Sequence, residues 1–183
     1  VRAELPDVHV IELPDAPDRY ADAIREDPVF TRLALSREDH ERPRYYAEQQ
    51  ARLQVQQRVP SLEDFYRSLQ QEVAIAPLLA GNAERAAQLT QKTNQFNLTT
   101  KRYTTPQVLD LATRPGWRVF TLTVSDRFGD SGLTGLAITH EHDGTCEIDT
   151  FLLSCRIIGR TVETALLAFL VERARGLGLA LVR

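Results

Sequence analysis

The sequence contains no methionine at any position, including the first. A chain without an initiating residue is expected to be part of a longer polypeptide, and the apolar run from Leu177 to Val182 has the composition of a strand that has only begun. Cysteine is also scarce, with only Cys146 and Cys155. Their separation within one predicted strand region is not expected to bring the two thiols together. We therefore predict reduced thiols and a cytoplasmic protein.

Long apolar runs and an excess of positive charge are absent as well. No segment has the length of a membrane-spanning helix, and no secretory signal pattern opens the chain. The 22 basic and 25 acidic side chains give a formal net charge of −3, so no basic face for nucleic acid is expected. These features predict a globular protein whose partner is a small molecule or a protein surface, rather than nucleic acid or a membrane.

The clearest pattern that is present lies between residues 145 and 177. An apolar segment over 147–154 predicts a buried strand, and a helix follows with apolar side chains at helical spacing: Val162, Leu166, Leu167, Phe169, Leu170 and Ala174. Gly159, between them, allows a sharp turn and a close approach of the backbone to a ligand. The start of the helix offers unpaired N–H groups, which predicts a phosphate or pyrophosphate site. A structural turn without a ligand is the alternative.

A second candidate site is the polar run from Lys92 to Tyr103, in which Asn, Gln and Thr follow one another. Such residues favour loops over helices because their side chains compete for backbone hydrogen bonds. We predict a loop that hydrogen-bonds a polar substrate, with Lys92, Lys101 or Arg102 near an anion. A capped loop with no ligand remains the alternative.

The remaining elements follow in order along the chain. The helix over 36–58 is sparse in apolar residues and is interpreted as a solvated connector with Ser36 as its cap. The other expected elements are a strand at 8–12, a helix at 18–25, a helix at 62–70 with Ser61 as its cap, and a strand at 73–77. They continue with a helix capped by Asn82, a helix with Thr105 as its cap and Pro106 at its first position, and strands at 117–124 and 132–139.

From residue 72 this order resembles the acyl-CoA N-acyltransferase (GNAT) superfamily. The resemblance implies an α/β (α+β) fold with a central, mostly antiparallel sheet and flanking helices. In that family Arg/Gln-x-x-Gly-x-Gly/Ala cradles the pyrophosphate of coenzyme A, and Arg156, Gly159, Arg160 and Thr161 stand at this place, Thr161 departing from the small final residue. The implied cofactor is coenzyme A or the phosphopantetheine arm of an acyl carrier protein.

Three blocks, at 92–104, 125–135 and 147–163, resemble the C-terminal half of FkbH-like proteins, and residues 1–20 resemble the tail of their haloacid-dehalogenase-like (HAD) domain. This implies a HAD-like tail over 1–30, a helical connector over 31–71 and a GNAT-like domain over 72–183, truncated at its C-terminus. The family is associated with loading a glyceryl unit from 1,3-bisphosphoglycerate onto an acyl carrier protein for polyketide biosynthesis. The Asp-x-Asp phosphatase pattern does not occur in this sequence, so Mg²⁺ is expected only in a HAD-like part outside it.

Cys155 is the predicted nucleophile, because a cysteine at a helix start beside two arginines is favoured as thiolate. Asp149 is a candidate general base, although Asp149 and Glu147 could instead bind the 92–103 loop through Arg102 or Lys101. In the loop, the residues predicted to orient the substrate are Asn94, Gln95, Asn97 and Arg102.

No metal site is predicted, because His140 and His142 lack the spacing of a metal site with a carboxylate and are interpreted as surface residues. Two alternatives to glyceryl transfer stay open. One is a non-catalytic module that docks a carrier protein, and the other is a coenzyme A-dependent N-acyltransferase acting on an amine.

Overall fold

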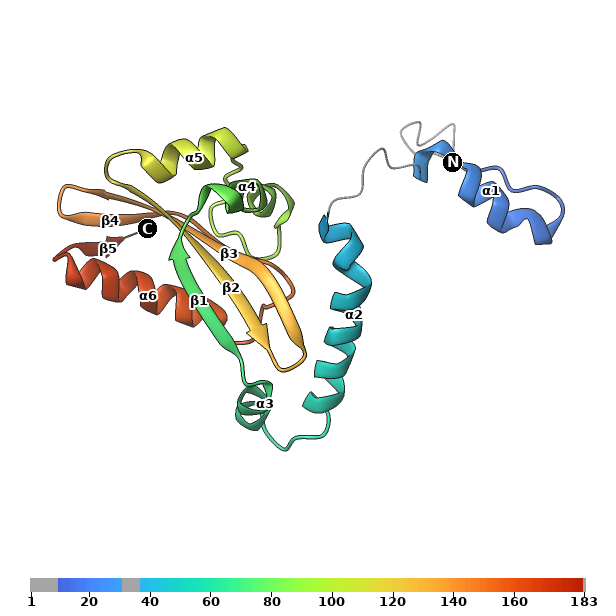
Figure 1. Ribbon diagram of the computed structural model, residues 1–183, viewed down its shortest axis with the longest axis horizontal. Helices are drawn as coiled ribbons and strands as arrows, with labels where there is room; N and C mark the ends of the chain where they lie inside the picture. Colours follow the sequence, from blue (N-terminus) through green and yellow to red (C-terminus); the bar gives the residue numbers. More distant parts are fainter. Residues whose placement is uncertain (1–9, 31–36, 183) are drawn as a thin grey trace. The chain divides into compact units, whose positions relative to one another are not determined.

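The computed structural model describes residues 10–30 and 37–182 (Figure 1). The chain divides into two compact units, Val1–Arg44 and Tyr45–Arg183. The first unit contains short helices. The second contains the sheet, its covering helices and both candidate sites predicted from the sequence.

In the first unit, residues 10–12 are not in a strand, so the strand predicted over 8–12 is wrong for its described part. Residues 8 and 9 lie outside the described range. A strand needs a neighbour for its backbone groups, and apolar alternation over five residues does not supply one. The helix predicted over 18–25 is confirmed as η1, Pro17–Arg19, followed by α1, Tyr20–Glu26, and a further turn, η2, covers Pro28–Phe30.

Helix α2, Arg37–Gln56, confirms the helix predicted over 36–58, whose predicted cap, Ser36, lies outside the described residues. The interpretation as a solvated connector does not hold for two residues in the second half of α2. Glu48 is only 9% exposed and Arg52 only 4%. The helix was predicted to be exposed to solvent because these residues are charged. In the structure they are buried, because Arg52 forms ion pairs with Glu48 and Asp126.

A five-stranded sheet forms the centre of the second unit, and its strands follow the order of the chain. The first four strands pair antiparallel, and the last pairs parallel to its neighbour. The fold class predicted from the sequence, a mostly antiparallel sheet with flanking helices, is therefore confirmed. The strands are β1, Glu72–Pro77; β2, Trp117–Asp126; β3, Gly129–His142; β4, Thr145–Leu153; and β5, Ala180–Val182.

Helices cover both faces of this sheet (Figure 1). One face packs against α6, Val162–Gly176, and the other against α4, Ala83–Lys92, and α5, Thr105–Thr113. Strand residues alternate between the two cores, so that Ala137 belongs to the α6 side and Ile138 to the α4–α5 side. The alternation sets which polar side chains near the strand ends share a face.

Helix α3, Leu62–Leu69, confirms the predicted helix and its cap, because the Ser61 hydroxyl accepts the Asp64 N–H at 3.1 Å. Asn82 does stand at the start of α4, after the turn η3, Ala80–Asn82, but its side chain makes no capping hydrogen bond. Asn82 therefore occupies the predicted N-cap position, but the capping hydrogen bond expected from its side chain is absent.

Helix α5 is capped one residue earlier than predicted. Thr104, not Thr105, is the N-cap, and the Gln107 side chain accepts the Thr104 N–H at 2.8 Å. Because the carboxamide of Gln107 reaches back only from the N3 position, it selects Thr104 as the cap. Since α4 ends at Lys92 and α5 begins at Thr105, residues 93–103 lie entirely in the loop.

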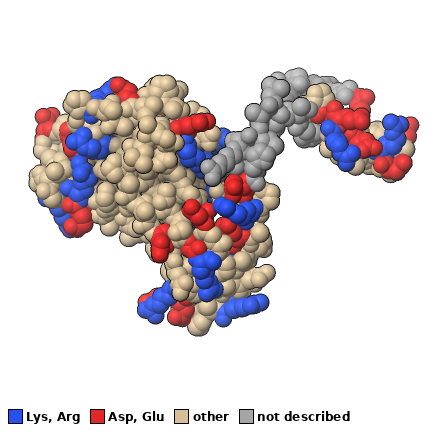
Figure 2. Space-filling view, viewed as in Figure 1, with Lys and Arg blue, Asp and Glu red and all other residues tan. Residues whose placement is uncertain are grey.

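Basic and acidic side chains are interspersed on the face of the molecule seen in Figure 2. Among the described residues, no helix combines the length and apolar character that crossing a membrane requires.

Candidate functional site

The segment from Ser154 to Thr161 connects β4 to α6 and makes the tight turn predicted from the sequence. Ile157 is fully buried beneath it, and the Ile157 N–H donates to Ser154 O at 3.1 Å. Gly159 has φ +77°, a left-handed conformation that glycine adopts without strain. A Cβ placed on Gly159 would have no atom within 4 Å, so the space above the backbone is open.

The start of α6 lacks the usual side-chain cap. Thr161 occupies the N-cap in a left-handed conformation, with φ 62°, and makes no capping hydrogen bond. Its hydroxyl donates instead to the Arg160 carbonyl at 2.6 Å. The first N–H groups of α6 therefore have no cap from Thr161, and they lie at the positive end of the helix dipole. This arrangement can hold an anion next to Gly159.

Arg160 lies under the turn. Its guanidinium is buried and donates to Asp126 Oδ2 at 3.1 Å and to the Arg156 carbonyl at 2.6 Å. Burial lowers the pKa of Arg160 to about 10, with a further contribution from the nearby charge of Arg52. Contact between Arg160 and a cofactor stays a prediction, whereas the structure gives its side chain a role in shaping the turn.

Arg156 extends towards α2, where its guanidinium lies over the ring of Tyr45, 4.2 Å from the ring centroid. Burial lowers its pKa from the ordinary value of arginine. The side chain of this first motif residue therefore packs against an aromatic ring, a contact that stabilises the cation through the ring quadrupole.

Asp126 joins α2, β2 and the turn. Arg52 donates to its two carboxylate oxygens at 2.7 and 2.9 Å, and the Phe128 N–H donates at 2.9 Å. Burial acts to raise the pKa of Asp126, but the hydrogen bonds from Arg52 and Phe128 outweigh it and hold the pKa below the usual value. The sequence analysis did not single out Asp126. The sequence did contain a signal for a buried ion pair in α2, since Glu48 and Arg52 are spaced one helical turn apart.

The predicted substrate loop runs along the outer edge of β4. The Leu98 N–H donates to Phe151 O at 3.1 Å, and the Leu153 N–H donates to Phe96 O at 3.0 Å. The second bond brings the loop to the point where β4 enters the turn. The two candidate sites, predicted independently, are therefore neighbours.

Within the loop the predicted residues divide into exposed and structural ones. Asn94 and Gln95 are exposed. Asn97 is buried and accepts the Thr100 N–H at 3.0 Å. Arg102 donates to Asn94 Oδ1 at 2.6 Å and also bonds the carbonyl oxygens of Thr90 and Thr93. Asn97 and Arg102 therefore shape the loop. Gln95 is exposed, and the exposed Asn94 already accepts a hydrogen bond from Arg102 through its amide oxygen.

Asp149 is 5% exposed and binds the loop. It pairs with Lys101, accepts the Tyr103 hydroxyl at 2.6 Å and accepts the Thr150 hydroxyl at 2.9 Å. Burial alone would raise the pKa of Asp149, but the Lys101 and Tyr103 bonds outweigh it and lower the pKa. Burial and Asp149 together raise the pKa of Tyr103. This is the loop-binding alternative considered from the sequence, with Lys101 rather than Arg102 as the partner of Asp149.

The two cysteines differ in access. Cys155 is exposed at the start of the turn, and Cys146 is buried on β4 with its pKa raised by burial. Only the Cys155 thiol can be reached by a substrate without a change in the fold. Its role as nucleophile stays a prediction.

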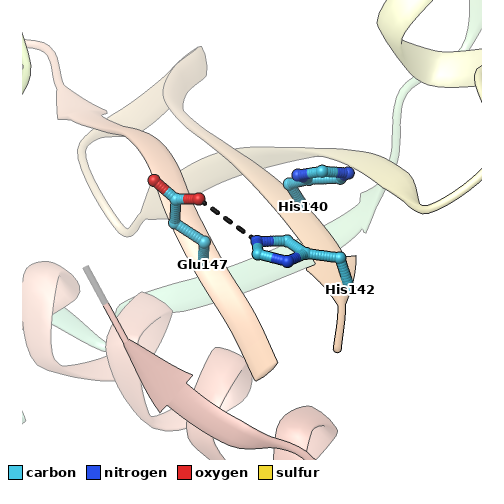
Figure 3. Close-up of side chains that lie close together, drawn as sticks. All are labelled: His140, His142 and Glu147. Atoms are coloured by element: carbon cyan, nitrogen blue, oxygen red, sulfur yellow. Dashed lines mark hydrogen bonds and ion pairs between the residues drawn. The ribbon is translucent and has the colours of Figure 1, made fainter. Parts of the chain in front are cut away.

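At the other end of β4, three side chains come together that the sequence reasoning kept apart (Figure 3). His140 lies directly opposite Glu147 across the β3–β4 pair, and potential ligand atoms of His140, His142 and Glu147 all lie within 4.8 Å of one another. The statement that neither histidine has a carboxylate at metal-site spacing is therefore wrong. The carboxylate comes from the neighbouring strand, and strand register is not visible as linear spacing.

No protein-family model and no curated protein match this sequence. Similar solved structures include the Escherichia coli ribosomal-protein-S18-alanine N-acetyltransferase, with 15% sequence identity and a TM-score of 0.48. The alignment covers 61% of this chain and 66% of the E. coli chain. The Brucella melitensis ribosomal-protein-alanine N-acetyltransferase is 18% identical, with a TM-score of 0.46 and coverage of 60% and 77%. PaiA N-acetyltransferase from Thermoplasma acidophilum, solved with coenzyme A, is 13% identical, with a TM-score of 0.44 and coverage of 59% and 75%.

The aligned part of this chain thus spans just under two thirds of the E. coli enzyme. All three proteins are N-acetyltransferases by name, and none of the three is an FkbH-like or HAD-like protein.

Proposed function

We propose that the unit Tyr45–Arg183 is an acyltransferase domain that holds a phosphopantetheine thioester at the β4–α6 turn. The observation that carries the proposal is the combination of Gly159 and Thr161, both with positive φ, at the uncapped start of α6. Phosphate groups of coenzyme A, or of the arm of a carrier protein, would accept hydrogen bonds from the N–H groups at the start of α6. The resemblance to the GNAT superfamily in element order supports the same assignment.

The acyl group would lie towards the loop over 92–103. The hydrogen bond between Leu153 and Phe96 places Gln95 and Cys155 on two segments that meet at the end of β4. Amides of Asn94 and Gln95 suit a hydroxyacyl group, because each carries both donors and an acceptor. Such a polar surface fits a glyceryl unit better than an unsubstituted acyl chain.

For the finer function we propose glyceryl transfer, which rests on the FkbH-like resemblance. The Cys155 thiolate would attack the acyl-phosphate carbonyl of 1,3-bisphosphoglycerate, and the C1 phosphate would leave as a 3-phosphoglyceryl thioester forms. Hydrolysis of the remaining 3-phosphate by water, which yields the glyceryl group, would belong to a HAD-like domain. The pantetheine thiolate of an acyl carrier protein would then attack that thioester and release the cysteine thiolate. Mg²⁺ would belong to a HAD-like partner domain, since the pattern that binds it does not occur in this sequence.

The test of the acyltransferase assignment is binding of coenzyme A and of phosphopantetheinylated carrier protein, measured by calorimetry. Gly159→Trp should abolish binding, because the side chain fills the open space and disfavours the left-handed conformation. Gly178→Trp is the matched control: it also has a positive φ, +68°, and no atom within 4 Å of its Cβ position. Equal binding by wild type and Gly159→Trp would refute the proposal.

Glyceryl transfer is tested separately by mass spectrometry after incubation with 1,3-bisphosphoglycerate. A 3-phosphoglyceryl adduct, or a glyceryl adduct where the 3-phosphate has been hydrolysed, on the peptide that carries Cys155 and lost in Cys155→Ala supports the cysteine as acyl acceptor. Loading of the carrier protein by Cys155→Ala at the wild-type rate would leave docking as the role of this unit. Release of coenzyme A thiol from acetyl-CoA with an amine would instead favour the N-acyltransferase alternative.

A further inference from the structure

We propose that His140, His142 and Glu147 form a binding site for a divalent transition-metal ion, with Zn²⁺ as the reference ion. The three side chains converge at the β3–β4 hairpin (Figure 3). Nothing in the proposed acyltransferase chemistry uses them. Glu147 is six residues from Leu153 along β4, roughly 20 Å at about 3.3 Å per residue.

The register of the hairpin fixes the ligands on one face of the sheet. His140 and His142 are two residues apart on β3, and Glu147 is the direct partner of His140 on β4. Asp143 and Gly144 form the turn between the strands, with φ values of 46° and 73°, which suits a tight two-residue hairpin connection. The ligand set is therefore arranged by backbone pairing before any ion binds.

The distances fit a small coordination sphere. His142 Nε2 lies 3.4 Å from Glu147 Oε2, close to the edge of about 3.3 Å in a tetrahedron of metal–ligand bonds of 2.0–2.1 Å. The ligand atoms of all three residues lie within 4.8 Å of one another. The His140 side chain would move closer to the other two when an ion binds. Two imidazole nitrogens and one carboxylate suit zinc, nickel or copper better than magnesium or calcium.

The surroundings of the two imidazoles support this assignment. His142 Nδ1 lies 3.5 Å from Asp143 Oδ2, so a carboxylate faces the ring nitrogen that would not bind the metal. This is the usual partner of a ligating histidine, and it directs Nε2 towards the ion. The ring of His140 stacks on Trp117, with ring centroids 4.5 Å apart and an interplanar angle of 15°.

Partial exposure leaves room for further ligands. The side chains of His142 and Glu147 are 39% and 44% exposed. Three protein ligands would leave at least one coordination position for water or for a ligand of the ion, as in open zinc sites.

Trp117 is the only tryptophan of the chain and provides the assay. We expect CuCl₂ to quench its fluorescence, with saturation at one equivalent in a tag-free protein at pH 7.5. ZnCl₂ should reverse the quenching by competition, and MgCl₂ should not.

The variants His142→Ala and Glu147→Gln should weaken zinc binding at least tenfold, and each leaves the strand pairing intact. Cys155→Ser is the control, since it removes another potential ligand, which follows the opposite end of β4, and it should retain wild-type affinity. Unchanged zinc affinity in Glu147→Gln and in the double variant His140→Ala/His142→Ala would overturn the proposal. The proposal would also be overturned if saturable quenching by CuCl₂ were lost in Cys155→Ser but kept in the variants of His140, His142 and Glu147.

Discussion

The two ends of β4 present different kinds of chemistry. At the end that enters α6, the candidate ligands are backbone N–H groups, exposed by a turn in which Gly159 and Thr161 have positive φ. At the hairpin end, the candidate ligands are side chains, His142 and Glu147 among them. Backbone donors suit anions and imidazoles suit metal cations. The same strand therefore carries two candidate sites of opposite charge preference at its two ends.

The supports of the two ends differ as well. The turn end rests on buried charges, because Arg52 and Arg160 both bind Asp126, whose side chain is fully buried. The hairpin end rests on strand pairing and on the stack of Trp117 with His140, and the ion pairs of His142 there are exposed. We expect the turn end to depend on charge partners and the hairpin end to depend on backbone geometry.

The largest effect is expected from Asp126→Ala, which leaves two buried guanidinium groups without their carboxylate. We expect a loss of about 3–5 kcal/mol in the free energy of unfolding, measured by urea denaturation. Arg67→Ala is the control, because its exposed pair with Glu63 should contribute below about 1 kcal/mol. A loss no larger than that of the control would show that the turn end does not depend on this ion pair.

Asp149→Asn tests the carboxylate that ties the loop to β4 between the two ends. Loss of a hydrogen-bonded charge should cost about 1.5–3 kcal/mol at pH 7. Because the folded state lowers the pKa of Asp149, its stabilisation is complete above the unfolded value of about 3.9 and is lost as pH falls towards the folded value.

The wild type should therefore lose more stability than Asp149→Asn between pH 5 and pH 2, as measured by urea denaturation at a series of pH values. Parallel pH profiles for the two proteins would contradict the lowered pKa. Glu147→Gln, measured in the same way, separates this effect from that of the exposed carboxylate at the hairpin end.

Gly116→Ala should affect the hairpin end alone. Gly116 has φ +78°, and an added Cβ would lie 2.9 Å from the Glu141 carbonyl and 3.6 Å from His140 Nε2. We expect a destabilisation of about 1–2 kcal/mol from the backbone conformation, together with weaker zinc binding.

Gly132→Ala is the matched control for Gly116→Ala, with φ +66° and no atom within 4 Å. It should show the backbone cost and unchanged zinc affinity. Equal zinc affinity in the two variants would argue against a role of Gly116 in placing His140.

The smallest effect is expected from Thr161→Gly at the turn end. Glycine adopts the left-handed conformation without the cost that threonine has there, which favours the folded state. Glycine also has more conformational freedom in the unfolded chain, which opposes folding, so we expect the free energy of unfolding to rise by only about 0.5 kcal/mol. Thr164→Gly, in the first turn of α6, should instead destabilise the protein. Thermal unfolding compares the two, and a destabilisation by Thr161→Gly would show that the threonine side chain stabilises the turn.

Patterns that are local in the sequence predicted the structure well. Alternation predicted β2, an apolar segment predicted β4, and the Ser61 cap and the glycine turn at Gly159 were correct, because each depends on residues close together in the chain. The isolated strand at 8–12 failed because a strand depends on a partner. Its pattern contained no information about that partner.

Contacts between distant segments were predicted poorly. The burial of Arg52 depends on Asp126, and the grouping of His140 with Glu147 depends on strand register. The functional roles of Cys155 and Gly159 remain predictions, since the structure supplies only their positions. Charged helices such as α2 look solvated in a sequence whenever their partners lie far along the chain.

The strand order of the sheet has a consequence for the folding of the chain. Since neighbours in the sheet are neighbours in sequence, β2, β3 and β4 can pair through two short hairpins. Pairing of β1 must close the long segment that contains α4 and α5, and pairing of β5 must wait for α6. Contacts of short sequence separation form fastest, so the folding nucleus is expected in the β2–β4 meander. Mutations in this meander should slow folding, whereas mutations in β5 should mainly speed unfolding.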